Sequence, residues 1–101
     1  MEKAEAERNI REIRDKIDDI DFQIISLFGE RNRLVEKIVI YKTGKTDVVA
    51  RERQEEIIRS RRTFAERFGL NPDLIEKIYR ILIKNNIQKE LEILEHKENK
   101  K

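Results

Sequence analysis

Several charged side chains interrupt apolar stripes that helical periodicity otherwise predicts. Arg31 stands in a stripe that Leu27 and Leu34 continue on either side, and Arg14 lies beside the same stripe, three residues before Ile17. A buried arginine without a partner is very costly, so each of these cations must face a carboxylate of the protein or an anionic ligand. The guanidinium fork binds carboxylates at two points, which suits it to the second task.

The C-terminal part of the chain shows a similar change of character. A stripe that begins apolar and leads through Leu82 becomes polar at Asn86 and Glu90 before it returns to Ile93. Glu90 and Glu52 are candidate carboxylate partners for the arginines. Two interpretations therefore stay open: an ion-pair network inside a helical oligomer, and a cationic pocket for an anionic ligand.

Three helices must position these side chains. Apolar residues at steps of three and four from Ile10 onwards predict a first helix over residues 6–42, which Gly29 does not interrupt. The apolar residues that follow predict a second helix over 48–67 and a third over 72–94.

Residues that favour helix ends mark the breaks between these helices. Gly44 suits the position after a helix, and Thr46 or Asp47 is placed to cap the next one. In the stretch 69–72, the glycine ends the second helix, the asparagine caps the third, and the proline is the first helical residue.

The first predicted helix is too long for one compact protomer. At ~1.5 Å per residue it extends roughly 55 Å. It must therefore project beyond its own subunit or pair with a copy. We predict an all-α fold of three helices per protomer with a very long first helix, assembled as an intertwined homodimer.

The composition places these helices in one ordered domain. Charged residues make up 44% of the 101 residues, but the net charge is only +2 and the apolar residues are periodic. We predict a single helical domain over residues 1–95 and a polar, frayed tail over 96–101. The nearly balanced charge argues against a nucleic-acid partner, and no apolar run approaches the ~20 residues of a membrane span.

The expected cellular location follows from two absences in the sequence. The chain contains no cysteine, which is compatible with a reducing compartment. Residues 1–8 are charged and lack the apolar core of an export signal. We therefore expect a cytoplasmic protein.

Three other polar groups have simpler explanations than a site. His96 is the one histidine and falls in the polar tail, where it makes no metal site. The basic run 59–62 is expected to be a solvated helix face, because no aromatic platform accompanies it. Asp18, Asp19 and Asp21 face different directions around a helix, so no metal site is predicted there.

A set of short motifs occurs in a recognisable order along residues 8–94. They are IRDKIDDID at 13–21, ER at 30–31, Lys42, RER at 51–53, GLNP at 69–72 and IYRILI at 78–83. In this order they resemble the all-helical chorismate mutase family. The resemblance implies a dimer of three-helix protomers whose long first helices cross between subunits. It also implies the rearrangement of chorismate to prephenate, which needs no metal or other cofactor.

By the same resemblance, the basic residues would hold the dicarboxylate substrate. Arg14 would reach into the partner's site and bind one carboxylate, and Arg31 would bind a carboxylate within its own subunit. Lys42 would contact a carboxylate and the ether oxygen of the breaking bond. Arg51 would support the site, and Glu52 would hold the substrate's hydroxyl group.

Three further positions, also expected to contact the substrate, differ from the family pattern. Val48 stands where the family commonly has an aspartate, three residues before Arg51, and Asp47 precedes it. Asn86 takes a position that is often a small hydroxyl residue. Glu90 takes the position of a glutamine whose amide donates to the ether oxygen.

The presence of Glu90 in place of glutamine predicts that activity depends on pH. Donors aimed at the ether oxygen stabilise the charge that builds there in the transition state. A protonated carboxyl group can donate, whereas an ionised one cannot. We expect the working form to carry a neutral Glu90. In the alternative, Glu90 stays ionised and pairs with Arg31 or with the partner's Arg14.

Two other functions stay open on the sequence alone. Isochorismate pyruvate lyase shares this fold and most of these residues. A non-catalytic helical dimerisation or regulatory module would use the same charged residues only as ion pairs.

Overall fold

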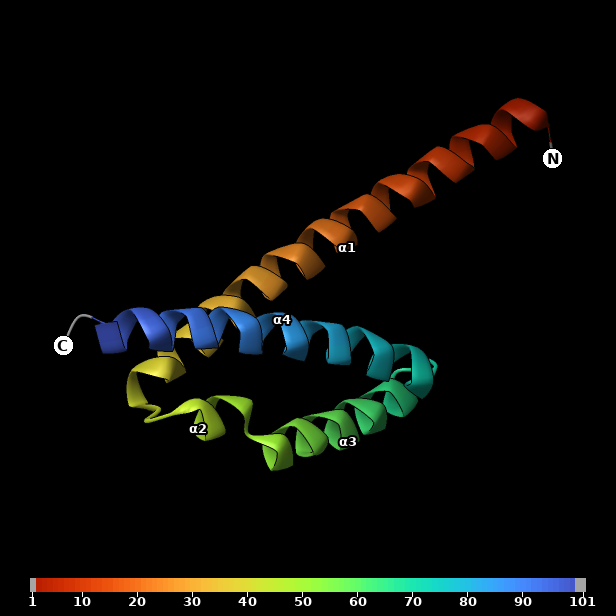
Figure 1. Ribbon diagram of the computed structural model, residues 1–101. Coiled ribbons are helices and arrows are strands. Elements are labelled where there is room, and N and C mark those ends of the chain that lie inside the picture. Colours follow the sequence, from red (N-terminus) through yellow and green to blue (C-terminus); the bar gives the residue numbers. More distant parts are fainter. Residues whose placement is uncertain (1, 100–101) are drawn as a thin grey trace. The chain divides into compact units, whose positions relative to one another are not determined.

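All regular structure in the described part of the chain is helical. The computed structural model describes residues 2–99. Its elements are α1 (Lys3–Ile38), the 3-10 turn η1 (Val39–Tyr41), α2 (Lys45–Val49), α3 (Arg51–Arg67) and α4 (Pro72–Asn99). Figure 1 shows them in chain order. The all-α class and the long first helix are confirmed. None of the helices within residues 2–99 combines the length and the apolar character that crossing a membrane requires.

The chain divides into two compact units, Met1–Arg33 and Leu34–Lys101. The first unit consists of most of α1, in which no residue is buried. Its apolar stripe is exposed along its whole length. The exposed members are Ile10, Ile13, Ile17, Ile20, Ile24 and Leu27. Water therefore reaches a face whose spacing is that of a helix-packing seam.

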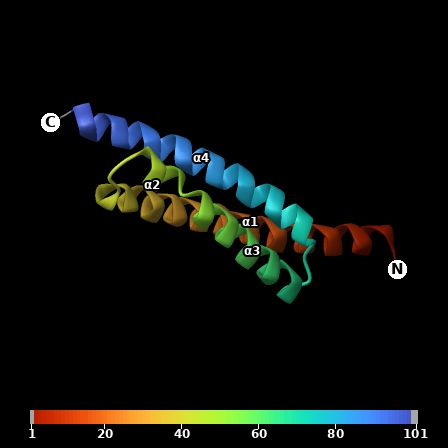
Figure 2. The same cartoon turned by 60° about the horizontal axis from the view of Figure 1, so that its bottom comes forward.

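The second unit is built around an antiparallel hairpin of α3 and α4 (Figure 2). The turn between them follows the predicted residues closely. Gly69 adopts a left-handed φ of 72°, Leu70 N–H donates to Ala65 O at 2.8 Å, and Gly69 N–H donates to Glu66 O at 3.2 Å. This Schellman motif satisfies the last carbonyls of α3. The Asn71 side chain then accepts from Asp73 N–H at 2.9 Å and caps α4.

Side chains between the two helices of the hairpin fix their pairing. Ile58, Ala65 and Ile83 are buried. At the edge, Arg62 pairs with Asp73 at 2.9 Å and with Glu76 at 3.0 Å. Burial of apolar surface supplies most of the stabilisation here, and exposed ion pairs of this kind add little individually.

A second apolar cluster joins η1 and α2 to the C-terminal half of α4. Val39, Val48 and Leu94 are buried together. Ile87, Leu91 and Ile93 pack against them. This cluster ties the segment between α1 and α3, whose helices η1 and α2 are short, to α4.

Several helix boundaries differ from the prediction, and α1 begins at Lys3 instead of residue 6. α1 gives way after Ile38 to η1, whose C-cap is Lys42. Gly44 has an extended backbone (φ −174°) and is the N-cap of α2, so the prediction that it takes the position directly after the first helix is wrong. The second predicted helix is broken at Ala50, whose φ of 42° is left-handed. Burial of Val39 explains the change from α1 to η1, and burial of Val48 explains the break at Ala50, because packing overrides local propensity.

The third predicted helix is longer than expected. α4 continues to Asn99, so it includes residues 96–99 of the segment predicted to fray. No helix-breaking residue follows the buried Leu94, and the residues after it are mostly good helix formers. The remaining part of the predicted tail, 100–101, lies outside the described residues.

Candidate functional site

A buried ion pair between two distant parts of the chain is the central feature of the second unit. The Lys42 ammonium donates from Nζ to Glu90 Oε1 at 2.8 Å. Glu90 is buried on α4, and Lys42 is half-buried just after η1. A hydrogen bond between ionised partners is stronger than a neutral one, and burial removes the competing water.

The apolar cluster explains why these two residues meet. Val39 lies three residues before Lys42, and Leu94 lies one helical turn after Glu90. Both pack in the same buried cluster. The backbone N–H of Lys42 also donates to Val39 O at 3.1 Å, which ends η1 and turns Lys42 into an extended conformation. Packing of Val39 against α4 thus places the Lys42 ammonium next to the Glu90 carboxylate.

Asn86 completes a polar stretch on the inward face of α4. It is buried and lies four residues before Glu90, so the two side chains share one face of the helix. The apolar residues Ile83 and Ile87 continue that face. They line an open hollow of about 200 Å³ together with Gln54, Arg80 and Lys84. A buried carboxylate and a buried amide therefore lie on the same face of α4 as these two apolar residues.

The loop that carries Lys42 is closed by Asp47. The carboxylate of Asp47 accepts from Thr43 N–H at 3.1 Å and from Thr43 Oγ1–H at 2.7 Å. These bonds from Thr43, with a smaller contribution from the charge of Lys42, lower the pKa of Asp47. The prediction that Thr46 or Asp47 caps the following helix is wrong: both lie inside α2, whose N-cap is Gly44, and the Asp47 carboxylate reaches back to Thr43 in the loop.

Val48 lies beside this loop but faces the core. Its side chain is buried in the cluster with Val39 and Leu94. Only the backbone of Val48 is therefore available to a ligand. After it, the Gln54 side chain donates to Val49 O at 2.6 Å and supports the left-handed turn at Ala50.

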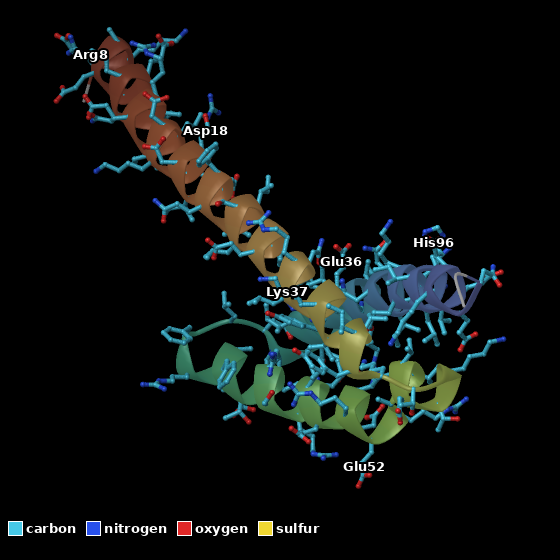
Figure 3. The ribbon with its side chains drawn as sticks, turned by 90° about the vertical axis from the view of Figure 1, so that its left-hand side faces the viewer. Arg8, Asp18, Glu36, Lys37, Glu52 and His96 are labelled. Atoms are coloured by element: carbon cyan, nitrogen blue, oxygen red, sulfur yellow. The ribbon has the colours of Figure 1, made fainter. Side chains whose placement is uncertain are left out.

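Arg51 and Glu52 are exposed at the start of α3. Figure 3 shows the Glu52 side chain projecting outward from that helix. Both residues line an open hollow that consists otherwise of neighbouring residues in the stretch 45–53. The structure does not bring these two predicted site residues into the buried pair, and their roles stay predictions.

Arg14 and Arg31 belong to the first unit. Arg14 is exposed on α1, whereas Arg31 is half-buried. Their predicted roles in holding carboxylates stay predictions. The sequence suggested Arg31, or Arg14 of a second subunit, as an ion-pair partner of Glu90. In the structure, Glu90 forms an ion pair with Lys42.

The basic run 59–62 is used within the α3–α4 hairpin. Arg61 donates to Ser60 Oγ at 2.8 Å and lies over the rings of Phe64 and Tyr79, with its Cζ at 5.8 and 5.5 Å from their centroids. Arg62 pairs with acids of α4, as described above. Among residues 2–99, no group of three or more His, Asp or Glu side chains could hold a metal ion.

Sequence reasoning missed one contact to the loop that carries Lys42. Lys97 Nζ donates to Ile40 O at 3.0 Å, although Lys97 falls in the segment predicted to fray. The missing signal was the length of α4: a helix that continues past Leu94 brings Lys97 to η1. No apolar periodicity predicts that α4 continues past Leu94, because the residues after Leu94 are nearly all charged.

Comparison with known proteins adds a family to this geometry. The profile of the chorismate mutase type II family matches residues 13–91. A chorismate mutase from Methanocaldococcus jannaschii is 32% identical over 92 residues, which are 90% of this chain and 93% of that protein. T-proteins from Haemophilus influenzae and Enterobacter agglomerans are 31% and 32% identical over 83 and 79 residues. These alignments cover 80% and 77% of this chain but 22% and 21% of the T-proteins, so the chain spans about a fifth of their length.

Proposed function

The chain belongs to the chorismate mutase type II family, and we propose that it catalyses the rearrangement of chorismate to prephenate with Lys42 and Glu90 at its active site. The observation that carries this proposal is the buried ion pair between these two residues, Nζ to Oε1 at 2.8 Å. A site for a dianion needs a cation in a water-poor place, and Lys42 stands in one. A site that acts on an ether oxygen needs a second donor, which a protonated Glu90 supplies.

The proposed reaction is unimolecular, so catalysis consists of positioning and electrostatics. One C–O bond breaks and one C–C bond forms within the substrate, while electron density moves onto the ether oxygen. Lys42 stabilises that density more in the transition state than in the ground state. Holding both carboxylates folds the flexible substrate into its reactive shape before the bond breaks.

When the substrate enters, Lys42 and Glu90 exchange partners. The ammonium turns from the Glu90 carboxylate to the oxygens of the substrate. An ionised Glu90 would then repel the charge that builds on the ether oxygen, so the productive complex carries its proton. Asn86, on the same face of α4, offers its amide to the remaining polar groups of the substrate.

The other predicted residues keep the roles that the family resemblance implies. Arg31 binds one carboxylate. Arg51 supports the site, Glu52 receives the substrate's hydroxyl group, and Val48 contributes its backbone. For the exposed Arg51 and Glu52, this role requires their side chains to turn inward when the substrate binds.

We propose that the protein works as an intertwined homodimer in which Arg14 serves the partner's site. The exposed apolar stripe of the first unit supports this, because a contiguous apolar surface of this kind is a protein-interaction surface. Light scattering should give a mass near twice the 12.2 kDa of one chain. A single-chain mass at micromolar concentration and above would exclude the dimer. The proposal places the enzyme in the cytoplasm, without a nucleic-acid or membrane partner.

The deciding experiment is an assay with purified protein and two substrates. Loss of chorismate together with formation of prephenate supports the proposal. Conversion of isochorismate to salicylate and pyruvate, without mutase activity, would instead assign the chain to the lyase reaction on this fold. No turnover of either substrate, with the helical fold verified by circular dichroism, would indicate a non-catalytic module.

A further inference from the structure

The backbone around Lys42 has little regular structure to hold it. Lys42 is extended (φ −90°, ψ 142°) between the end of η1 and the start of α2. Its side chain has four rotatable bonds, so the position of the ammonium depends on where the backbone is fixed. A displacement of about 1 Å in such a group can cost a large factor in rate.

Two charged side chains hold this segment, one on each side of Lys42. Lys97 Nζ donates to the carbonyl oxygen of Ile40 at 3.0 Å, two residues before Lys42. The Asp47 carboxylate accepts from Thr43 N–H at 3.1 Å and from Thr43 Oγ1–H at 2.7 Å, one residue after Lys42. Both contacts are charge-assisted, which makes them stronger than neutral hydrogen bonds.

The two contacts come from different directions. Lys97 reaches from the end of α4, across 57 residues of sequence. Asp47 reaches back by four residues within the loop itself. Lys97 therefore ties the segment to the helix that carries Glu90, whereas Asp47 closes the turn into α2. The positive charge of Lys97 also suits the carbonyl end of η1, where helical dipoles leave a partial negative charge.

We propose that Lys97 and Asp47 are positioning residues that fix the Lys42 ammonium against Glu90 and, on the proposed function, against the substrate. Neither residue touches the substrate. Each acts by restricting the backbone of 40–43, which in turn limits where Nζ can lie. The loop from Lys42 to Arg51 thus depends on two side chains that stand outside the binding residues.

The first test removes the donor at Lys97 and then restores it. Lys97→Met keeps the length and helix propensity of the side chain but removes the ammonium, and we expect kcat and kcat/KM to fall together by about tenfold, as when an interaction with the transition state is weakened. Lys97→Arg keeps a charged donor and should recover most of that loss. Lys77→Met, at an exposed position of the same helix, is the matched control and should keep wild-type rates.

The second test removes one of the two hydrogen bonds to Asp47, with little risk to folding. Thr43→Val deletes the hydroxyl donor and keeps the backbone N–H bond to Asp47. We expect a smaller fall in kcat than for Lys97→Met. The double variant Thr43→Val/Lys97→Met should lose more than either single change.

Amide hydrogen exchange gives a readout that does not need activity. Lys97→Met and Thr43→Val should each speed exchange at the amides of Lys42 and Thr43, while amides in the middle of α3 exchange as in the wild type. Unchanged exchange at Lys42 and Thr43, or kinetics equal to those of the Lys77→Met control, would overturn the proposal. If the wild type shows no mutase activity, the exchange result alone still decides whether these residues hold the loop. The failure of the proposed function and the failure of this inference are therefore separable.

Discussion

The Lys42 ammonium and the Glu90 carboxylate lie 2.8 Å apart, in side chains that are only 20% and 5% exposed. They are separated by 48 residues of sequence and meet because Val39, Val48 and Leu94 pack in one cluster. In the free protein, the Glu90 carboxylate is the hydrogen-bond and charge partner of the Lys42 ammonium. An anionic ligand that takes Lys42 leaves Glu90 next to added negative charge, so ligand binding and protonation of Glu90 are coupled.

The first prediction concerns the proton on Glu90. Because only a protonated carboxyl group can donate to the ether oxygen, activity should fall as pH rises. Glu90→Gln supplies a permanent donor, so it should stay active and lose most of that alkaline decline. The measurement is kcat/KM as a function of pH for both proteins. Glu92→Gln, an exposed change on the same helix, is the control. A Glu90→Gln variant with the wild-type pH profile would remove Glu90 from the proton step.

The second prediction concerns stability of the free protein. Lys42→Met leaves the buried Glu90 carboxylate without its ammonium partner, which should reduce the free energy of unfolding by about 1–3 kcal/mol. Adding Glu90→Gln removes the charge and should recover part of the loss. Urea unfolding of the two single variants and the double variant measures this coupling. Strictly additive effects would show that the ion pair contributes nothing in solution.

Much of the fold could be predicted from spacing and end signals. The long first helix followed from an apolar seam without a break, and the turn at 69–72 followed from its glycine, asparagine and proline, whose local roles do not depend on distant residues. The break at Ala50 could not be predicted, because a left-handed alanine is locally unfavourable. Burial of Val48 before the turn and the hydrogen bond from Gln54 to Val49 O account for its shape.

The candidate site was predictable only in part. Polar residues in apolar stripes pointed to Asn86 and Glu90, and both are buried. The family resemblance pointed to Lys42, for which no periodicity argument was available. The contact from Lys97 depends on how far α4 continues, and helix length past the last apolar residue is set by weak local terms.

The third prediction uses the ion pairs of the α3–α4 hairpin. Donation from Arg80, helped by Arg62, lowers the pKa of Glu76 below its ordinary value of 4.5. Since the folded pKa is lower than the unfolded one, this carboxylate stabilises the fold above the ordinary value, and the effect disappears as pH falls through the folded pKa. Glu76→Gln should therefore lower the urea midpoint at neutral pH and have less effect in acid. Glu66→Gln, at an exposed position of α3, is the control. A Glu76→Gln effect that does not change with pH would contradict this account.

The fourth prediction concerns the turn between α2 and α3. Ala50 has φ 42° and ψ 61°, where a β-carbon costs about 1–2 kcal/mol that glycine avoids. Ala50→Gly should raise the free energy of unfolding by up to about 1 kcal/mol. The gain is smaller than the relieved strain, because glycine has more conformational freedom in the unfolded chain and this favours unfolding. Ala6→Gly within α1 should have the opposite sign. Thermal melts of both variants measure the difference. A lower melting temperature for Ala50→Gly would show that the left-handed turn is not strained in solution.

The fifth prediction tests whether Arg14 acts across the proposed dimer. Removing Arg14, Arg31 or Lys42 from a dry dianion site should each cost roughly 10²-fold or more in catalytic efficiency. If Arg14 serves the partner's site, an Arg14→Ala subunit paired with a Lys42→Ala subunit carries one site with both defects and one site with neither. Mixing the two inactive variants should therefore restore about one working site per heterodimer. If Arg14 acted within its own subunit, every site in the mixture would lack one cation and no activity would return.

Mass spectrometry of differently tagged subunits verifies that subunits exchange. A mixture of Arg31→Ala with Lys42→Ala is the control. Both residues are proposed to serve their own subunit's site, so these two variants should not complement each other. Recovery in that control, or its absence for Arg14 after verified exchange, would contradict the proposed arrangement of the dimer.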